Sequence, residues 1–142
     1  YFEKLALVIA TLADNNMLED PYHTRAVRDG GRDGIGQYTI MNNLNNPLKV
    51  TYAVEAKCYS LDDGVGVKET SRLISRIRNR QFGILVTTSF VADQAYKEII
   101  EDEQPIAIIA GIDVIDILYN KLNITNSNIL LDYLITNYPK RI

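Results

Sequence analysis

An acidic residue and a lysine lie two positions apart in a run of β-forming residues, at Glu55 and Lys57. Side chains alternate between the two faces of a strand, so this spacing directs both charges to the same face. Val54 and Ala56 then point to the opposite face, towards a core. A second acid, Asp33, precedes them in a glycine-rich turn, and hairpin pairing would bring its carboxylate across from Glu55. The sequence predicts two acids and one base grouped at one sheet surface.

The oxygen atoms of this group suit a hard divalent cation. The carboxylates of Asp33 and Glu55, with the backbone carbonyl of Ala56, form the kind of oxygen site that binds Mg²⁺ and leaves room for water and phosphate oxygens. We expect Mn²⁺ to substitute. Such a metal stabilises charge on an attacked phosphate and lowers the pKa of a bound water, which the Lys57 ammonium can orient. The predicted chemistry is hydrolysis of a phosphodiester without a covalent intermediate.

Each of these residues also has an ordinary structural interpretation. An aspartate between glycines is commonly a turn former, and Asp29 is a second candidate for the role given to Asp33. Glu55 and Lys57 could be a pair on an exposed strand, which would contribute little to stability. Their apolar neighbours instead indicate a largely buried strand, where charges without a function would be costly. We therefore favour Asp33, Glu55 and Lys57 as the catalytic residues.

Hydrophobic periodicity predicts the elements that position these residues. Apolar residues at helical spacing predict an amphipathic helix over residues 1–16. A strand is expected over 22–28, followed by strands over 34–41 and 48–61 that form a hairpin through the turn-forming run NNLNNP. A helix is expected over 68–79. Its buried stripe should comprise Val67, Leu73, Ile74 and Ile77.

The second half of the chain predicts a β-α-β unit. The run FGILVTTS at 82–89 is short, continuous and β-branched, as expected of a strand buried on both faces, and PIAIIAG at 105–111 is a second such run. A helix over 93–101 connects them, so the two strands should be parallel. One or two further helices are expected over 113–138. The predicted architecture is α/β, with a central mixed β-sheet flanked by helices.

The other reactive side chains have simpler predicted roles. Thr87, Thr88 and Ser89 should end a strand and cap the helix that follows, as short hydroxyl residues commonly do. Cys58 is expected to be a small buried residue. The lone His23 is expected to be structural rather than catalytic.

Length and composition restrict the class of protein. With 142 residues, of which 46% are hydrophobic, we expect one domain over 1–142. It starts at Tyr1 with a helical pattern already under way, so we expect a fragment of a longer polypeptide. One cysteine and one histidine exclude an internal disulfide and a Cys/His zinc site. No stretch approaches the roughly 18 apolar residues of a membrane span, and we expect a cytoplasmic protein. The net charge of -3 argues against nucleic-acid binding by bulk electrostatics alone.

The order of these motifs resembles that of the PD-(D/E)xK nuclease superfamily, and within it the Mrr-like restriction endonucleases. Asp33 in GGRDGIG matches the first metal ligand, and residues 55–57 match the Glu-x-Lys motif. Arg32 stands where the superfamily label has a proline. The resemblance continues through the strand ILVTTS and covers residues 2 to about 118. It implies a restriction-endonuclease-like fold and a metal-dependent nuclease.

The resemblance also suggests residues outside the central group. Many relatives add an acidic metal ligand from the first helix, which falls on Glu3, although a glutamate on a polar helix face is more commonly only solvated. Independently of the resemblance, the polar face of the helix over 68–79 could contact the phosphates of a DNA backbone. It could equally present a solvated face, with Glu69 pairing locally. The residues that form this polar row are Lys68, Arg72, Arg76 and Asn79.

The resemblance implies a Mg²⁺-dependent endodeoxyribonuclease that cuts double-stranded DNA as the cleavage domain of a restriction endonuclease. A separate DNA-recognition domain is expected in the full-length chain, and a homodimer would supply the second centre needed to cut both strands. The alternatives are a structure-selective nuclease similar to Holliday-junction resolvases, and a non-catalytic DNA-binding module of the same fold. The acidic charge weighs against the first, and the intact Asp33, Glu55 and Lys57 weigh against the second.

Overall fold

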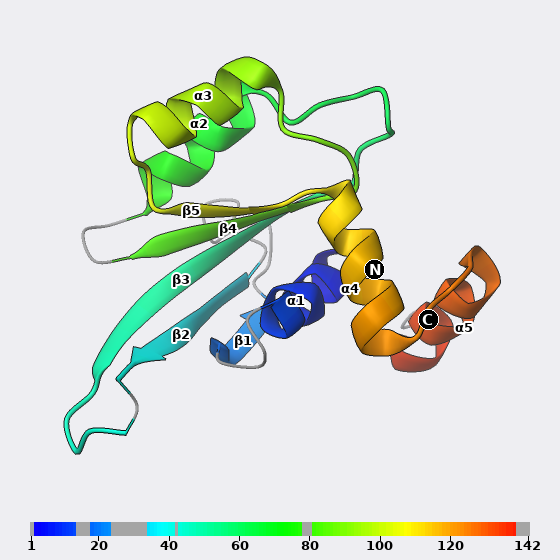
Figure 1. Ribbon diagram of the computed structural model, residues 1–142, viewed down its shortest axis with the longest axis horizontal. Helices are drawn as coiled ribbons and strands as arrows, with labels where there is room; N and C mark the ends of the chain where they lie inside the picture. Colours follow the sequence, from blue (N-terminus) through cyan, green and yellow to red (C-terminus); the bar gives the residue numbers. More distant parts are fainter. Residues whose placement is uncertain (1, 14–17, 24–33, 42, 78–80, 139–142) are drawn as a thin grey trace.

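A computed structural model describes residues 2–13, 18–23, 34–41, 43–77 and 81–138 of the chain. Figure 1 shows the helices and strands that these residues form. In chain order they are α1 (Phe2–Ala13), β1 (Leu18–His23), β2 (Gly34–Ile40), β3 (Leu48–Lys57), α2 (Val67–Arg76), β4 (Phe82–Thr87), α3 (Asp93–Glu101), β5 (Ile106–Ile109), α4 (Gly111–Leu122) and α5 (Ser127–Asn137).

The strands form one mixed sheet in the order β1-β2-β3-β4-β5. β1, β2 and β3 are antiparallel neighbours, whereas β3, β4 and β5 run parallel. The predicted mixed sheet, the hairpin and the parallel β-α-β pairing are therefore confirmed. Because β3, β4 and β5 run in the same direction, their carboxyl ends meet at one edge of the sheet (Figure 1). This edge is where β3 presents Glu55 and Lys57.

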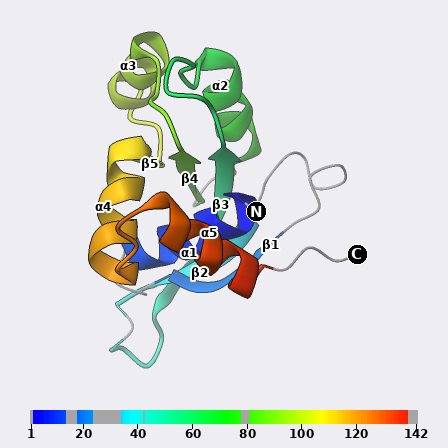
Figure 2. The same cartoon turned by 90° about the vertical axis from the view of Figure 1, so that its right-hand side faces the viewer.

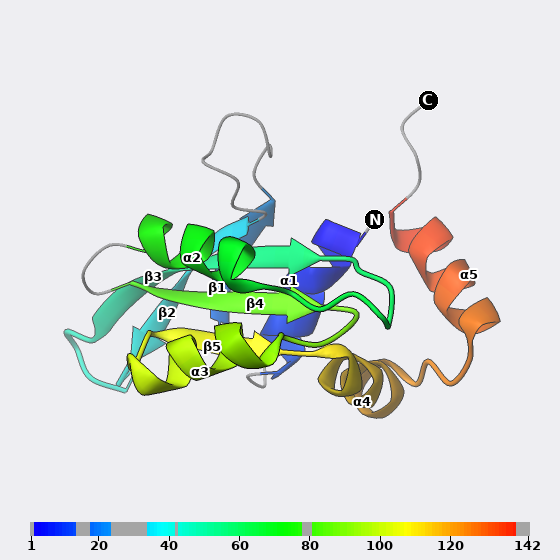
Figure 3. The same cartoon turned by 90° about the horizontal axis from the view of Figure 1, so that it is seen from above.

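Helices cover both faces of the sheet. α2 and α3 lie on one face and α1 lies on the other, while α4 and α5 lie beyond the carboxyl ends of the parallel strands (Figures 1 and 3). The larger core joins α1 and α4 to the sheet through residues such as Ile9, Val54 and Leu118. A smaller core on the α2 face contains Ala53 and Leu73. Successive residues of β3 therefore belong to different cores, as period-two alternation requires.

The first strand differs in extent from the prediction. β1 begins at Leu18, whereas a strand was predicted over 22–28, and residues 24–33 lie outside the described part of the chain. Pairing with β2 determines where β1 lies, with Leu18 opposite Tyr38, and local propensity does not reveal such a partner. α1 is described as far as Ala13, and residues 14–17, where the predicted helix ends, lie outside the described part of the chain.

The predicted strand over 48–61 ends early, at Lys57. Beyond this point the ladder to β4 stops, and the Thr88 hydroxyl donates a hydrogen bond to the Tyr59 carbonyl at 2.6 Å. The prediction that Cys58 is buried is wrong: this residue is exposed because it follows the end of the strand. Short strand ends of this kind depend on tertiary contacts rather than on the local sequence.

The hydroxyl residues after β4 do not cap α3 as predicted. Thr87 does end β4, but the N-cap of α3 is Ala92, without a side-chain cap hydrogen bond. The Ser89 hydroxyl instead donates to the Asp63 carbonyl at 2.6 Å. This hydrogen bond and the one from Thr88 to Tyr59 connect the loop after β3 to the end of β4. The hydroxyls therefore join two loops at the edge of the sheet that carries Glu55 and Lys57.

The remaining helices agree broadly with the prediction. In α2, Leu73 is fully buried and the other predicted stripe residues are half-buried, while Thr70 is also buried because its hydroxyl bonds back to the Val67 carbonyl. The tail forms two helices. Asn123, in the left-handed region with a φ of 54°, ends α4, and the Asn126 side chain accepts a hydrogen bond at the start of α5. None of the described helices is long and apolar enough to cross a membrane.

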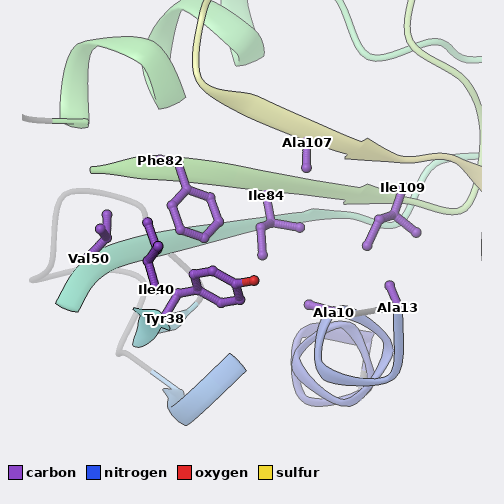
Figure 4. A pocket seen from close by; sticks show the side chains of 9 residues that line it. All are labelled: Ala10, Ala13, Tyr38, Ile40, Val50, Phe82, Ile84, Ala107 and Ile109. Atoms are coloured by element: carbon purple, nitrogen blue, oxygen red, sulfur yellow. The ribbon is translucent and has the colours of Figure 1, made fainter. Parts of the chain in front are cut away.

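α1 leaves part of its sheet face uncovered. An apolar groove of about 450 Å³ lies there, beside the end of α1 (Figure 4). Its lining includes Tyr38, Val50, Phe82, Ile84 and Ile109. These side chains point to the face opposite Glu55 and Lys57 and offer almost no polar groups, so the groove is not part of the candidate active site.

Candidate active site

The carboxyl end of β3 carries the two charged residues of the candidate site, Glu55 and Lys57. The Glu55 and Lys57 side chains share the face of Ala53, on which α2 packs, whereas Val54 faces α1. The Lys57 ammonium lies 3.0 Å from Oε1 of Glu55. The two residues are therefore a direct ion pair at the edge where the parallel strands end. Figure 2 views the molecule from this end.

Glu55 is almost completely enclosed. It is 1% exposed, while the Lys57 side chain is 20% exposed. The second carboxylate oxygen of Glu55, Oε2, is buried without a hydrogen-bond partner among the described residues. A buried carboxylate oxygen without a donor is costly, because the oxygen has lost its water and gained nothing in return. Glu55 thus has one oxygen that is suited to a further cation.

The predicted first ligand, Asp33, lies outside the described residues, as does the alternative Asp29. The next residue, Gly34, is the first of β2 and pairs with Val54, directly before Glu55 in β3. The described part of the chain contains no group of three or more His, Cys, Asp or Glu residues that could hold a metal ion. The roles of Asp33 and Asp29 as metal ligands therefore stay predictions.

Two residues to which the sequence analysis gave no part in the site, Tyr59 and Glu69, lie near enough to Lys57 for its charge to act on them. The Tyr59 hydroxyl donates a hydrogen bond to Oε1 of Glu69 at 2.9 Å, and the Gly66 backbone amide donates to Oε2 of Glu69 at 3.1 Å. Burial raises the pKa of Tyr59, and the Glu69 carboxylate raises it further. Glu69 is thus paired with Tyr59, ten positions away in the chain, and with a backbone amide. A signal was present, since Tyr59 continues the two-residue spacing from Glu55 and Lys57, and Glu69 stands at the third position of a helix.

The predicted DNA-contacting row lies along α2, on the sheet face that also carries the ion pair. Lys68 and Arg72 are exposed. Arg76 is half-buried, and its Nη1 atom is enclosed without a hydrogen-bond partner among the described residues. Asn79 lies outside the described part. Two cations of the row can therefore reach a ligand at the surface.

A family model for restriction endonucleases matches residues 2–118. The chain belongs to this family. The fold is also similar to two solved structures. One is the DNA modification-dependent restriction endonuclease AspBHI, with 39% sequence identity and a TM-score of 0.83 over 95% of this chain and 34% of that one. The other is the MspJI restriction endonuclease in complex with a 27-mer oligonucleotide, with 27% identity and a TM-score of 0.79 over 96% of this chain and 32% of that one. A search among curated proteins gave no match.

The predicted resemblance to Mrr-like restriction endonucleases and the predicted restriction-endonuclease-like fold are thus confirmed. The chain spans about a third of the length of the two enzymes whose structures it matches. The matched family region ends within α4, so α5 lies beyond it.

Restriction endonucleases of this family generally use divalent metal ions. The candidate site fits such an ion, because Glu55 is a hard oxygen donor with one oxygen that lacks a hydrogen-bond partner among the described residues. Glu3 lies in the first turn of α1, the helix on the opposite face, and its role as a further ligand stays a prediction. The role of the Ala56 backbone carbonyl also stays a prediction.

Proposed function

We propose that the chain is a Mg²⁺-dependent endodeoxyribonuclease, forming one cleavage domain over residues 1–142 within a longer restriction endonuclease. The observation that carries this proposal is the buried Glu55, paired with Lys57 and left with one oxygen that has no partner among the described residues. Membership of the restriction endonuclease family supports the same conclusion. Mn²⁺ should substitute for Mg²⁺ at an oxygen site of this kind.

Each residue of the site has a distinct proposed task. Asp33, Glu55 and the Ala56 backbone carbonyl would hold the metal ion, with Glu3 as a possible addition from α1. When bound, the ion supplies positive charge for the attacked phosphate and lowers the pKa of a coordinated water. Lys57, held by Glu55 and partly open to solvent, orients the attacking water and offsets the charge of the phosphate.

The proposed substrate is double-stranded DNA. Lys68 and Arg72 are exposed on α2, on the sheet face that carries the ion pair, and could contact backbone phosphates, with Arg76 contributing less because it is half-buried. The MspJI structure contains an oligonucleotide, and AspBHI is described as modification-dependent. We extend both properties to the longer protein: a separate domain would select modified DNA, and a cytoplasmic homodimer would place one centre on each strand.

The test is cleavage of supercoiled plasmid, methylated and unmethylated, by the full-length protein with Mg²⁺. Wild-type protein should cut, and both EDTA and the Glu55→Ala substitution should abolish cutting. Glu98→Ala, a change at a partly exposed position on α3, is the matched control and should cut normally. A folded wild-type protein that cuts none of these plasmids, nor branched junctions, would refute the proposal and favour a non-catalytic DNA-binding module.

A further inference from the structure

Lys57 lies between two carboxylates rather than beside one. Glu55 contacts it directly at 3.0 Å, and on the other side the Tyr59 and Glu69 pair is close enough for the Lys57 charge to act on both residues. Tyr59 follows Lys57 by two positions, just beyond the end of β3. Burial raises the pKa of Tyr59 and the Lys57 charge opposes this rise, so the ammonium and the phenol lie close enough to interact.

The backbone holds this second group in place. The Thr88 amide donates a hydrogen bond to the Lys57 carbonyl at 3.2 Å, and the Thr88 hydroxyl donates to the Tyr59 carbonyl at 2.6 Å. One residue of the neighbouring chain segment thus fixes both ends of the short stretch from Lys57 to Tyr59. The Tyr59 ring packs against the core beneath α2. Lys57 and Tyr59 are thus presented by one short segment that is hydrogen-bonded at both ends.

The direction of the Tyr59 proton is also fixed. Glu69 accepts from the Tyr59 hydroxyl with Oε1, while the Gly66 amide occupies its Oε2. Burial and the hydrogen bond to Glu69 raise the pKa of Tyr59, so the phenol keeps its proton at neutral pH. A phenol whose proton is directed to a carboxylate can still accept a hydrogen bond at its oxygen. An ammonium is a donor only, which makes Lys57 a suitable partner.

The proposed function creates a need for such an acceptor. A metal ion on Glu55 would compete with Lys57 for the same carboxylate, and an ammonium on a flexible stem would then lose the ion pair that it makes with Glu55 among the described residues. We propose that Tyr59 is a positioning residue for Lys57: its phenolic oxygen accepts a hydrogen bond from the Lys57 ammonium once Glu55 binds the metal ion, and Glu69 orients the phenol for this role. The proposal rests on the proposed nuclease function.

Steady-state cleavage by the full-length protein provides the first test. Tyr59→Phe keeps the ring in the core and removes the hydroxyl, so kcat should fall about tenfold, the effect of one hydrogen bond to a charged group, while KM for DNA changes less than about twofold. Glu69→Gln keeps one acceptor oxygen, so its kcat should lie between that of Tyr59→Phe and that of the wild type. The matched control is Tyr119→Phe, on the exposed side of α4, which should leave both constants unchanged.

Chemical labelling of Lys57 provides a readout that does not depend on cleavage. Acetylation of Lys57 is measured by mass spectrometry without DNA, with and without Mg²⁺, relative to the exposed Lys97 on α3. In the wild type Mg²⁺ should leave Lys57 labelling nearly unchanged, because Tyr59 takes over from Glu55. In Tyr59→Phe, Mg²⁺ should raise labelling severalfold. A merely structural tyrosine would lower thermal stability without making Lys57 labelling depend on Mg²⁺.

The outcomes separate the two proposals. If the wild type cuts DNA and Tyr59→Phe matches it in kcat and in Mg²⁺-dependent labelling, the positioning role is wrong and the nuclease function stands. If the wild type does not cut DNA, and Lys57 labelling is the same in Tyr59→Phe as in the wild type, both proposals fail. The positioning role is supported if Tyr59→Phe has a lower kcat and if Mg²⁺ raises Lys57 labelling in this variant but not in the wild type.

Discussion

Replacing Glu55 and replacing Lys57, the two members of the buried ion pair, should have different consequences for stability. Without metal, Glu55→Gln should leave the domain as stable as the wild type or make it more stable, whereas Lys57→Met should destabilise it. The reason is the difference in exposure: Glu55 is 1% exposed and cannot be hydrated, while the Lys57 side chain is 20% exposed. Whichever residue remains loses its ion-pair partner, and only lysine can recover water in exchange.

The size of each effect follows from the same geometry. Removing one partner of a fully buried ion pair costs about 3–5 kcal/mol, and the partial exposure of Lys57 lowers our expectation for Lys57→Met to about 2–3 kcal/mol. In Glu55→Gln the side-chain oxygen can still accept from Lys57, and the amide nitrogen replaces an oxygen that has no partner among the described residues. A neutral amide costs less to bury than a carboxylate, so the change should stay within about 1 kcal/mol or favour folding.

Urea unfolding of the full-length protein in EDTA measures the difference, and hydrogen exchange of peptides from β3 assigns it to this domain. The double variant, Glu55→Gln with Lys57→Met, should recover most of the stability lost in Lys57→Met, because no buried charge is left. A loss above about 2 kcal/mol in Glu55→Gln, with Lys57→Met close to wild type, would refute the reasoning. Glu55 would then be an ordinary structural acid whose oxygens are satisfied within the fold.

Three further predictions concern the surroundings of the site. Arg72→Ala should weaken DNA binding at unchanged kcat and reduce the salt dependence of log Kd by about one unit, as measured by filter binding. Gly111→Ala should destabilise the domain by about 1–3 kcal/mol in thermal unfolding. Its new methyl group would lie 2.6 Å from the Thr88 carbonyl oxygen, so the start of α4 must move. Burial alone would raise the pKa of Glu69, but hydrogen bonds to the carboxylate, including that from Tyr59, lower it from its usual 4.5. Because the folded-state pKa is lowered, this stabilisation is complete above pH 4.5 and lost as the pH falls further, so wild type should lose more stability than Glu69→Gln on acidification.

The sequence predicted those parts of the fold that depend on local pattern. The β-α-β unit was recognisable because β4 is a continuous apolar run and α3 has a clear helical period, and α3 has the predicted bounds of 93–101. The shared face of Glu55 and Lys57 followed from the two-residue period of a strand. These features need no knowledge of distant contacts.

Features that depend on distant contacts were missed or misjudged. The end of β3 at Lys57 is set by hydrogen bonds from Thr88, a residue far along the chain. For this reason the exposure of Cys58 was predicted wrongly. The contact between Tyr59 and Glu69 joins the end of a strand to the first turn of a helix. The two-residue spacing indicates the side to which Tyr59 points, but no pattern in either segment reveals that it meets Glu69. Catalytic roles for Asp33, Glu55 and Lys57 stay predictions until the variants are measured.

The two covered faces of the sheet explain why the site is formed at the end of β3. In the middle of this strand both faces are packed, with Val54 in one core and Ala53 in the other, so a charged side chain there would have no access to a substrate. Past Lys57 the strand ends and the chain becomes exposed. Glu55 and Lys57 occupy the boundary: the acid is enclosed in a region of low dielectric, where its charge acts strongly on a cation, and the lysine reaches solvent. Moving the pair two residues towards the amino end would bury both charges. Moving it two residues further would put the acid at the partly exposed position of Lys57. This register of β3 is therefore the one that gives a shielded acid beside an accessible base.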